Sequence, residues 1–331
     1  MTSSSPAHLD WLDSVRALAC VLVVLLHTAS PIAGAYTPTD KWMAANVIDA
    51  AARACVPLFF MVSGFLFFRT RAPGWRNFKR LVAALLFYSF IYIALRGTMT
   101  GQVEPGDIAA ILAGPVHFHL WFFYPQIAIY VVAAFVCIRT PSPAALGAAA
   151  VALLVLNPSV DALTGLDTSA LRAGGDLFYY VLYAIMGAIL GQRAQEGHAL
   201  PGAPISLIVF LAATAAIAIL TKLASEAAGE FVGDFYRYRS PLVALAAISI
   251  FCILAQSGPP RRIASTVSFL SRHSLAIYGL HAIPLELVRR SPIMDHDSGL
   301  VVVLLSFGLV MAATLPLAMA LKRIDRGALV S

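Results

Sequence analysis

The sequence contains few charged residues. Only 12% of its 331 residues are Asp, Glu, Lys or Arg, whereas 60% are hydrophobic and the mean hydropathy is +0.81. A soluble domain is typically about 25% charged, so this composition excludes an ordinary soluble enzyme and indicates a polytopic membrane protein. No polar stretch is long enough for a separate soluble domain. We therefore predict one membrane domain over residues 1–331, with short tails at about 1–11 and 322–331.

Several common functional signatures are also missing. The four cysteines lie in separate apolar runs without metal-ligand spacing, so we predict neither a disulfide nor a metal site. The sequence has no Gly-rich phosphate loop, no Gly-x-Ser-x-Gly elbow and no His-Glu-x-x-His motif. The net charge of +6 does not indicate nucleic-acid binding, because basic residues of membrane proteins collect in cytoplasmic loops. Acidic residues are almost absent from the apolar runs, which disfavours an ion-coupled transporter.

Long apolar runs are what the sequence has in abundance. A spanning helix needs about 20 apolar residues, and the runs predict an all-α membrane protein with about ten transmembrane helices. The basic cluster from Arg69 to Arg80 favours a topology with both termini cytoplasmic. The ten helices are expected near residues 14–36, 44–68, 78–96, 118–138, 143–157, 177–192, 203–223, 240–256, 265–288 and 299–321.

The first apolar run carries two ionisable residues, Arg16 and His27. Such groups at membrane depth are energetically expensive, which makes them candidates for a functional site. Their spacing of eleven residues, at about 100° per residue, places both side chains on one helix face, about 16 Å apart along the axis. Asp13 precedes Arg16 by three residues, a spacing that allows an ion pair. Two alternatives remain open: Arg16 as a snorkelling anchor, and His27 as a buried histidine satisfied by a neighbouring helix.

The predicted topology brings unusual polar residues from four helices to one depth, in the outer half of the membrane. They are His27, Arg53, His119 and His281. We expect them to line a polar cavity that is open to the outside, with Arg16 at its cytoplasmic throat. For His281, a hydrogen bond to a neighbouring helix is an equally valid explanation.

Two aromatic residues accompany this set. Trp121 lies beside His119, and Tyr278 lies one turn before His281. Both either shape the site or belong to the aromatic belt at the membrane interface. The basic run 69–80 is explained either as a positive-inside signal or as a means of drawing an anionic cosubstrate to the cytoplasmic mouth.

Five segments, in order along the chain, resemble the membrane-bound acyltransferase 3 family of ten-helix bacterial enzymes. An arginine directly before Ala-Cys-Val-Pro-Leu-Phe-Phe, together with His-Leu-Trp, resembles its enterobacterial common antigen O-acetyltransferase branch. The sequence departs from the family after Arg80, where Leu81-Val-Ala-Ala lacks the second arginine that many members carry. The five segments are Arg16 with His27, Val56-Pro-Leu-Phe-Phe-Met-Val-Ser-Gly-Phe65, Phe78-Lys79-Arg80-Leu, His119-Leu-Trp121-Phe-Phe and Ser274-Leu-Ala-Ile-Tyr278-Gly-Leu-His281.

The resemblance implies an O-acyltransferase of the bacterial inner membrane. It would transfer an acyl group, most simply acetyl, from cytoplasmic acyl-CoA to a hydroxyl of an envelope or exported glycan or its lipid-linked precursor. We expect His27 to be the general base, because the ordinary pKa of histidine, about 6.5, lies near operating pH; the sequence does not separate this role from a covalent acyl-histidine. Arg16 would orient or bind the donor, and Asp13 would support it. The remaining expected contacts are Lys79 and Arg80 for acyl-CoA, and Arg53, His119, Trp121, Tyr278 and His281 for the acceptor.

A transporter or flippase for a polar or lipid-linked solute is the alternative from a different functional class. It would use the same polar cavity without chemistry, and it would neither bind nor consume acyl-CoA. A scaffold or sensor is disfavoured, because a scaffold gains nothing from costly charges inside the membrane.

Overall fold

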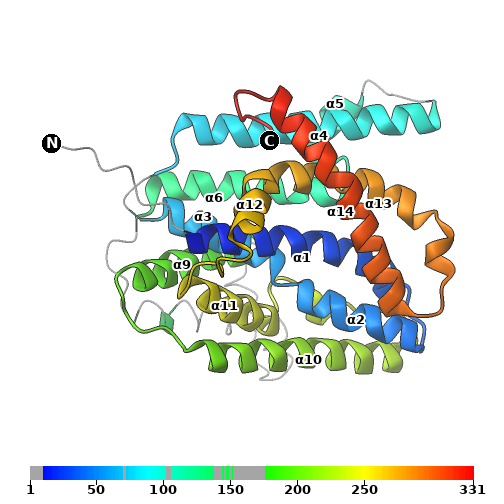
Figure 1. Cartoon of the computed structure of the whole chain (residues 1–331), viewed down its shortest axis with the longest axis horizontal. Coiled ribbons are helices and arrows are strands. Elements are labelled where there is room, and N and C mark those ends of the chain that lie inside the picture. The colour runs from blue at the N-terminus through cyan, green and yellow to red at the C-terminus, as the bar shows by residue number, and fades with distance from the viewer. Residues whose placement is uncertain are drawn as a thin grey trace.

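The computed structural model describes residues 10–69, 72–101, 106–137, 144, 147–148, 151 and 176–331. Every regular element in these ranges is helical (Figure 1). The α-helices are α1 (Asp10–Gly34), α2 (Asp40–Ala52), α3 (Cys55–Phe67), α4 (Trp75–Thr100), α5 (Gly106–Ala113), α6 (Phe123–Phe135), α9 (Asp176–Gln195), α10 (Ala203–Ala228), α11 (Pro241–Ala255), α12 (Ala264–Leu280), α13 (Ala282–Arg289) and α14 (Gly299–Ile324). Short 3₁₀ helices are η1 (Phe118–Phe122), η3 (Asp234–Tyr236) and η4 (Pro292–Asp295).

Eight helical stretches in the described part of the chain are long and apolar enough to cross a membrane. They match the predicted helices one to four, six to eight and ten. The predicted fifth helix, 143–157, falls largely outside the described residues. The predicted ninth helix, 265–288, is present as two helices, because α12 ends before His281 and α13 begins after it.

The described spanning helices begin and end at the two ends of the bundle. We call one of them the basic end: α1 and α4 begin there, and α14 ends there. At this end Arg69 donates a hydrogen bond to Gln195 at 2.5 Å, which joins the end of α3 to the end of α9. At the opposite end, Lys41 of α2 donates to the carbonyl of Met294 at 2.7 Å. In Figure 1, α1 runs through the middle of the molecule, with α10 along one edge and α4 along the other.

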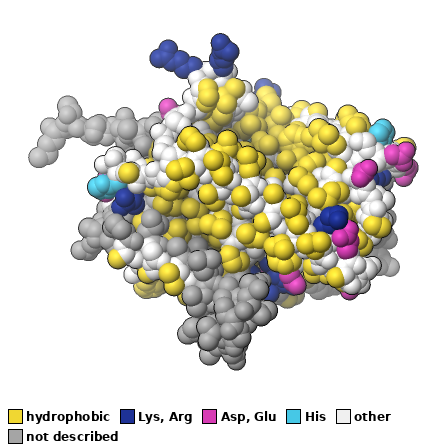
Figure 2. All heavy atoms as spheres, turned by 90° about the horizontal axis from the view of Figure 1, so that it is seen from below, with side chains coloured by type: hydrophobic (Ala, Val, Ile, Leu, Met, Phe, Trp, Pro, Cys, Tyr) yellow, Lys and Arg dark blue, Asp and Glu magenta, His cyan; other side chains and the backbone are white. Residues whose placement is uncertain are grey.

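The surface of α10 is apolar. Ile205, Ile208, Leu211 and Ile219 are all more than half exposed. Seen from this side, hydrophobic side chains cover the central part of the face, and charged side chains gather toward its ends (Figure 2). A broad apolar belt with charges at its margins is the surface that a bilayer requires.

Glycines let α3 and α9 approach closely. A Cβ atom added to Gly64 would lie 1.7 Å from the carbonyl oxygen of Ala184, and one added to Gly187 would lie 2.1 Å from that of Met61. Small residues at a membrane helix interface allow such backbone contact. The two helices therefore form one tightly packed pair, and α3 carries one wall of the site described below.

Two breaks interrupt helices in the described chain, and a proline explains each. A proline has no N–H for the carbonyl four residues earlier, and its ring clashes with that carbonyl. Pro57 lies four residues after Arg53, between α2 and α3, and Pro284 lies four residues after Leu280, at the end of α12. The backbone at Arg53 and His281 keeps helical dihedral angles, so the chain continues in the same general direction. Only the regular helical hydrogen bonds are interrupted at these two positions.

The predicted tail at 322–331 is shorter than expected and is packed. Helix α14 continues to Ile324, and the Asp325 carboxylate then accepts hydrogen bonds from the amides of Leu329, Val330 and Ser331 at 2.8–3.1 Å. Burial alone would raise the pKa of Asp325, but these hydrogen bonds outweigh it and the pKa is lowered. Arg80 donates to the Ser331 carbonyl at 2.8 Å, which ties this segment to α4.

Candidate active site

His27 of α1 and His281, between α12 and α13, form a hydrogen-bonded pair. His27 Nδ1 lies 2.8 Å from His281 Nε2, and the two rings are nearly parallel, with an interplanar angle of 11°. His281 is fully buried, whereas His27 is only partly buried. The pair therefore has one inaccessible member and one whose side chain is partly exposed.

The backbone fixes the tautomers of this pair. His281 Nδ1 lies 2.7 Å from the carbonyl oxygen of Tyr278, and a carbonyl can only accept. We therefore assign the proton of neutral His281 to Nδ1, which leaves its Nε2 as the acceptor for His27 Nδ1–H. The lone pair of neutral His27 then lies on Nε2. This arrangement resembles the histidine of a catalytic triad, with a ring in place of the carboxylate.

A second histidine pair lies against the first. His117 Nδ1 and His119 Nδ1 are 2.9 Å apart, and His119 Nε2 lies 3.4 Å from the carbonyl oxygen of Gly279. By the same reasoning, His119 carries its proton on Nε2 and accepts from His117. Burial lowers the pKa of His117, opposed by Glu286 and aided by Arg289, so His117 is neutral near pH 7. The rings of His119 and His281 meet edge to face, with centroids 5.0 Å apart.

The end of α12 supplies both carbonyl acceptors. Tyr278 and Gly279 are consecutive residues in its last turn, upstream of Pro284. Tyr92 of α4 also donates to the Gly279 carbonyl, at 2.9 Å. Gly279 is required here for space, because a Cβ atom would lie 2.2 Å from the ring of Tyr88. The proline break and this glycine together allow α4 and both histidine pairs to meet at one point of α12.

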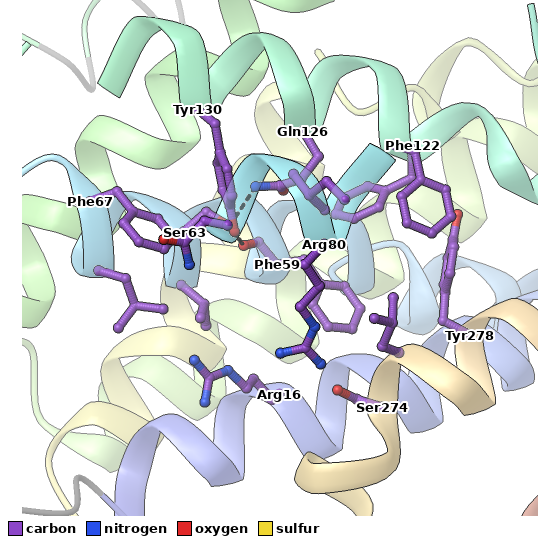
Figure 3. A pocket seen from close by; sticks show the side chains of 16 residues that line it. Arg16, Phe59, Ser63, Phe67, Arg80, Phe122, Gln126, Tyr130, Ser274 and Tyr278 are labelled. Carbon is purple, nitrogen blue, oxygen red and sulfur yellow. Dashed lines mark hydrogen bonds between the residues drawn. The ribbon is translucent and has the colours of Figure 1, made fainter. Parts of the chain in front are cut away.

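A cavity of about 270 Å³ lies between these histidines and the basic end; we call it the arginine cavity. Figure 3 shows the guanidinium groups of Arg16 and Arg80 on one side of it, with Gln126 and Tyr130 across from them. Gln126 donates to Ser63 at 2.9 Å. Tyr278 lines the cavity, and its hydroxyl donates to the carbonyl of His119, so this one residue borders both the cavity and the histidine pairs.

Asp13 forms an ion pair with Arg16. Its carboxylate lies 3.7 Å from the Arg16 guanidinium, which confirms the ion pair predicted from their spacing. Asp13 also accepts a hydrogen bond from Ser271 of α12 at 2.6 Å. The interaction thus joins α1 to α12 at the basic end of the cavity. Lys79, expected beside Arg80, is exposed and is not among the residues that line the cavity.

Arg53 occupies a separate pocket of about 320 Å³, lined also by Ser30 and Tyr236. Its guanidinium lies 2.5 Å from Asp49 and 4.3 Å from the centre of the Tyr236 ring. Asp49 also accepts from Ser30 at 2.9 Å, so the arginine belongs to a buried and compensated network.

The structure therefore divides the set expected to share one cavity. It brings together His27, His119, Tyr278 and His281. Trp121 instead packs its ring on Tyr238, a lining residue of the Arg53 pocket, with centroids 5.7 Å apart.

Asp49 and His117 are among the site residues that were missed from the sequence. Asp49 lies four residues before Arg53, a helical ion-pair spacing that was available to find it. His117 precedes η1 in extended backbone, so no helical pattern includes it.

A proline four residues downstream marks three of the expected site residues. They are His27 with Pro31, Arg53 with Pro57 and Trp121 with Pro125. Each proline leaves the carbonyl of the site residue without its helical donor. This spacing is a local signal in the amino-acid sequence that sets these residues apart from the rest of their helices.

The described helices enclose titratable pairs and an arginine-lined cavity, which defines a multi-pass membrane protein with a reactive polar interior. The model of an acyltransferase domain family, acyltransferase 3, matches residues 9–323. The chain therefore belongs to this family and is an acyltransferase. No curated protein matches the chain, and no solved structure does. The more specific resemblance, to the enterobacterial common antigen branch, stays a prediction.

Proposed function

We propose that the chain transfers an acyl group, most simply acetyl, from acyl-CoA to a hydroxyl of an envelope or exported glycan or its lipid-linked precursor, across the bacterial inner membrane. The observation that carries the proposal is the His27–His281 pair, whose tautomers leave a basic nitrogen on the partly exposed member. Family membership supplies the reaction type.

His27 acts as the general base in this proposal. Its Nε2 takes the proton of the acceptor hydroxyl while the oxygen attacks the thioester carbonyl carbon. The C–S bond of the resulting tetrahedral adduct then breaks, and the CoA sulfur leaves with the proton returned by His27. The products are an ester and free CoA. His281 positions the ring and accepts from its Nδ1–H throughout, so the imidazolium formed in between is stabilised by a hydrogen bond that already exists.

Acyl-CoA occupies the arginine cavity from the basic end. Arg16 and Arg80 contribute two guanidinium groups there, a preferred partner for phosphate. Lys79 contributes charge at the mouth only, because it is not among the residues that line the cavity. The acyl end of the donor reaches the histidines past Tyr278, which borders both spaces. The basic end is then cytoplasmic, in agreement with the positive-inside rule.

The glycan approaches from the opposite end. The Arg53 pocket, with its aromatic lining and the adjacent Trp121, suits the polar edge and apolar face of a sugar ring. In this arrangement Arg53 contacts the acceptor while Asp49 keeps its charge compensated.

The test is incubation of the purified protein in lipid with radiolabelled acetyl-CoA, with and without a glycan acceptor. Wild type should bind the donor and release CoA slowly without acceptor, and His27→Ala should lose the release. Arg16→Ala should weaken donor binding. His198→Ala is the matched control, because the His198 side chain is exposed and pairs with Glu196 at the surface. Folded protein that neither binds nor consumes acetyl-CoA would overturn the proposal in favour of a transporter.

A further inference from the structure

Another cavity, of about 550 Å³, opens on the side of the bundle between α4, the segment before η1 and α13; we call it the lateral cavity. Most of its wall is apolar, with Ile93 of α4 and Ile283 and Leu287 of α13 among the lining residues. Leu287 is 70% exposed, so the cavity opens at the surface of the spanning region. Nothing in the mechanism above uses this space.

Charge gathers at one end of the lateral cavity. Arg96 lies one turn beyond Ile93 on α4, and Arg290 follows α13, about 10 Å beyond Ile283 at about 1.5 Å per residue. On both helices, the arginine lies farther along the chain than the apolar residue. Both arginines therefore lie on the side of the cavity that faces away from the end where α4 begins. The cavity thus has a deep apolar part and a cationic rim, the pattern that complements an anionic lipid.

The one acid among the described residues that line this cavity is already paired. Glu286 lies 3.3 Å from Arg289, and the Arg289 guanidinium lies 5.1 Å from the centre of the Phe118 ring. Arg290 is exposed and has no acidic partner among the described residues. The rim therefore keeps a cation for a ligand.

The lateral cavity reaches the histidines. His117 lines it, and its Nδ1 is the atom that contacts His119. The ring of Phe118 lies between His117 and His27, with centroids 4.6 Å and 5.0 Å from them. A group held at the rim is thus two side chains away from the proposed base.

We propose that the lateral cavity binds a lipid-linked acceptor, a prenyl chain that ends in a phosphate ester carrying a sugar. The prenyl chain lies against Ile93 and Ile283, and the phosphate contacts Arg96 and Arg290. The sugar passes Phe118 toward His27, which lies one helical turn before Ser30 of the Arg53 pocket. This assignment rests on the proposed function, because it names the acceptor class of the same reaction. Charge complementarity and the direct approach to His117 favour it over an ordinary membrane phospholipid, which has no sugar hydroxyl to present.

The experiment measures binding of radiolabelled farnesyl phosphoglucose to the whole protein in detergent, without acyl-CoA. Arg290→Ala should weaken binding about tenfold, and Arg96→Ala by a similar factor, whereas Lys222→Ala, an exposed α10 cation paired with Glu226, should not. Farnesol, which lacks the phosphate, should bind weakly and equally to wild type and Arg290→Ala. Ile283→Trp should block the apolar part and reduce binding of both probes.

Two results would overturn the assignment. One is unchanged affinity for the probe in both arginine variants, measured on variants that unfold at the wild-type temperature. The other is displacement of the probe by phosphatidylglycerol at equal concentration, which would mark an ordinary lipid site. The test also separates this inference from the proposed function. His27→Ala should bind the probe normally and fail only in acyl transfer. A wild-type protein that binds the probe but never consumes acyl-CoA would be a lipid carrier; that result would support the lateral cavity as a binding site and overturn the proposed function.

Discussion

The two histidine pairs are built on the same rule but from different parts of the chain. Each ends on a carbonyl of α12, Tyr278 for one and Gly279 for the other. The His27–His281 pair joins residues 254 positions apart, whereas His117 and His119 are two positions apart. The first pair therefore exists only when α1 and α12 are packed, while the second needs little more than its local backbone. The proposed base therefore has its hydrogen-bond partner, and with it a fixed tautomer, only in folded protein.

The largest expected effect separates the two pairs directly. His27→Ala should lower the rate of acyl transfer by about 10²–10⁴-fold, because it removes the proposed base. Transfer of radiolabelled acetyl to the acceptor measures it, and thermal unfolding in detergent controls for folding. Transfer at the wild-type rate would eliminate the base role and remove the distinction between the pairs.

A second substitution asks what the buried member of the first pair contributes. His281→Ala should lower the maximal rate by about 10–100-fold, because His27 loses the acceptor that sets its tautomer. His281→Gln places a carbonyl oxygen near the same position and should recover most of the rate. The measurement is the pH profile of the maximal rate for both variants. Equal rates for Ala and Gln would show that His281 acts by packing alone.

A third substitution changes the last turn of α12, which both histidine pairs contact. Gly279→Ala should destabilise the protein by about 1–3 kcal/mol, because its Cβ would overlap the buried Tyr88 ring. Gly308→Ala in α14 is the matched control, since nothing lies within 4 Å of its Cβ position. Thermal unfolding of both variants measures the difference. Equal midpoints would mean that α4 adjusts freely at this contact.

The smallest effect concerns the second pair and pH. The pKa of His117 is lowered by folding, so the folded state binds fewer protons there than the unfolded state. The corresponding stability is present above the ordinary histidine pKa of about 6.5 and is lost as pH falls through the lowered value. His117→Ala should therefore lose less stability than wild type between pH 7 and 5. Parallel pH dependence in the two proteins would contradict this account.

Sequence reasoning predicted the spanning stretches and the contacts within one helix well, and the angular position of side chains poorly. The apolar runs located the spanning helices, and the spacing of Asp13 and Arg16 predicted their ion pair, because both depend on neighbours along one helix. His27 and Arg53 were placed at one depth, but hydropathy does not fix the rotation of a helix about its axis. Packing turned Arg53 toward Asp49 and Tyr236, in a pocket of its own.

The ninth helix and His117 illustrate a different limit. Both depend on places where the helical hydrogen-bond pattern lapses: the break before Pro284, and the extended backbone ahead of η1. A search for long apolar windows averages the hydropathy over a helix break or an extended segment. It therefore does not identify the residues at these positions, whose side chains reach the site. The prolines are visible in the sequence, but Pro31 and Pro316 lie inside continuous helices, so a proline alone does not locate a break.

The glycine contact between α3 and α9 determines which wall of the arginine cavity can move. Gly64 and Gly187 lock these helices backbone to backbone, so Ser63 and its neighbours on α3 form a stationary wall. Arg80 stands on α4, which has no such contact with α3 at this cavity and is fastened at Tyr88 and Arg80 by single hydrogen bonds to the segment after α14. Entry of the proposed acyl-CoA donor should therefore move the part of α4 that carries Arg80, with the contact of Tyr88 and Tyr92 at Gly279 as the hinge and the segment 325–331 released as it opens.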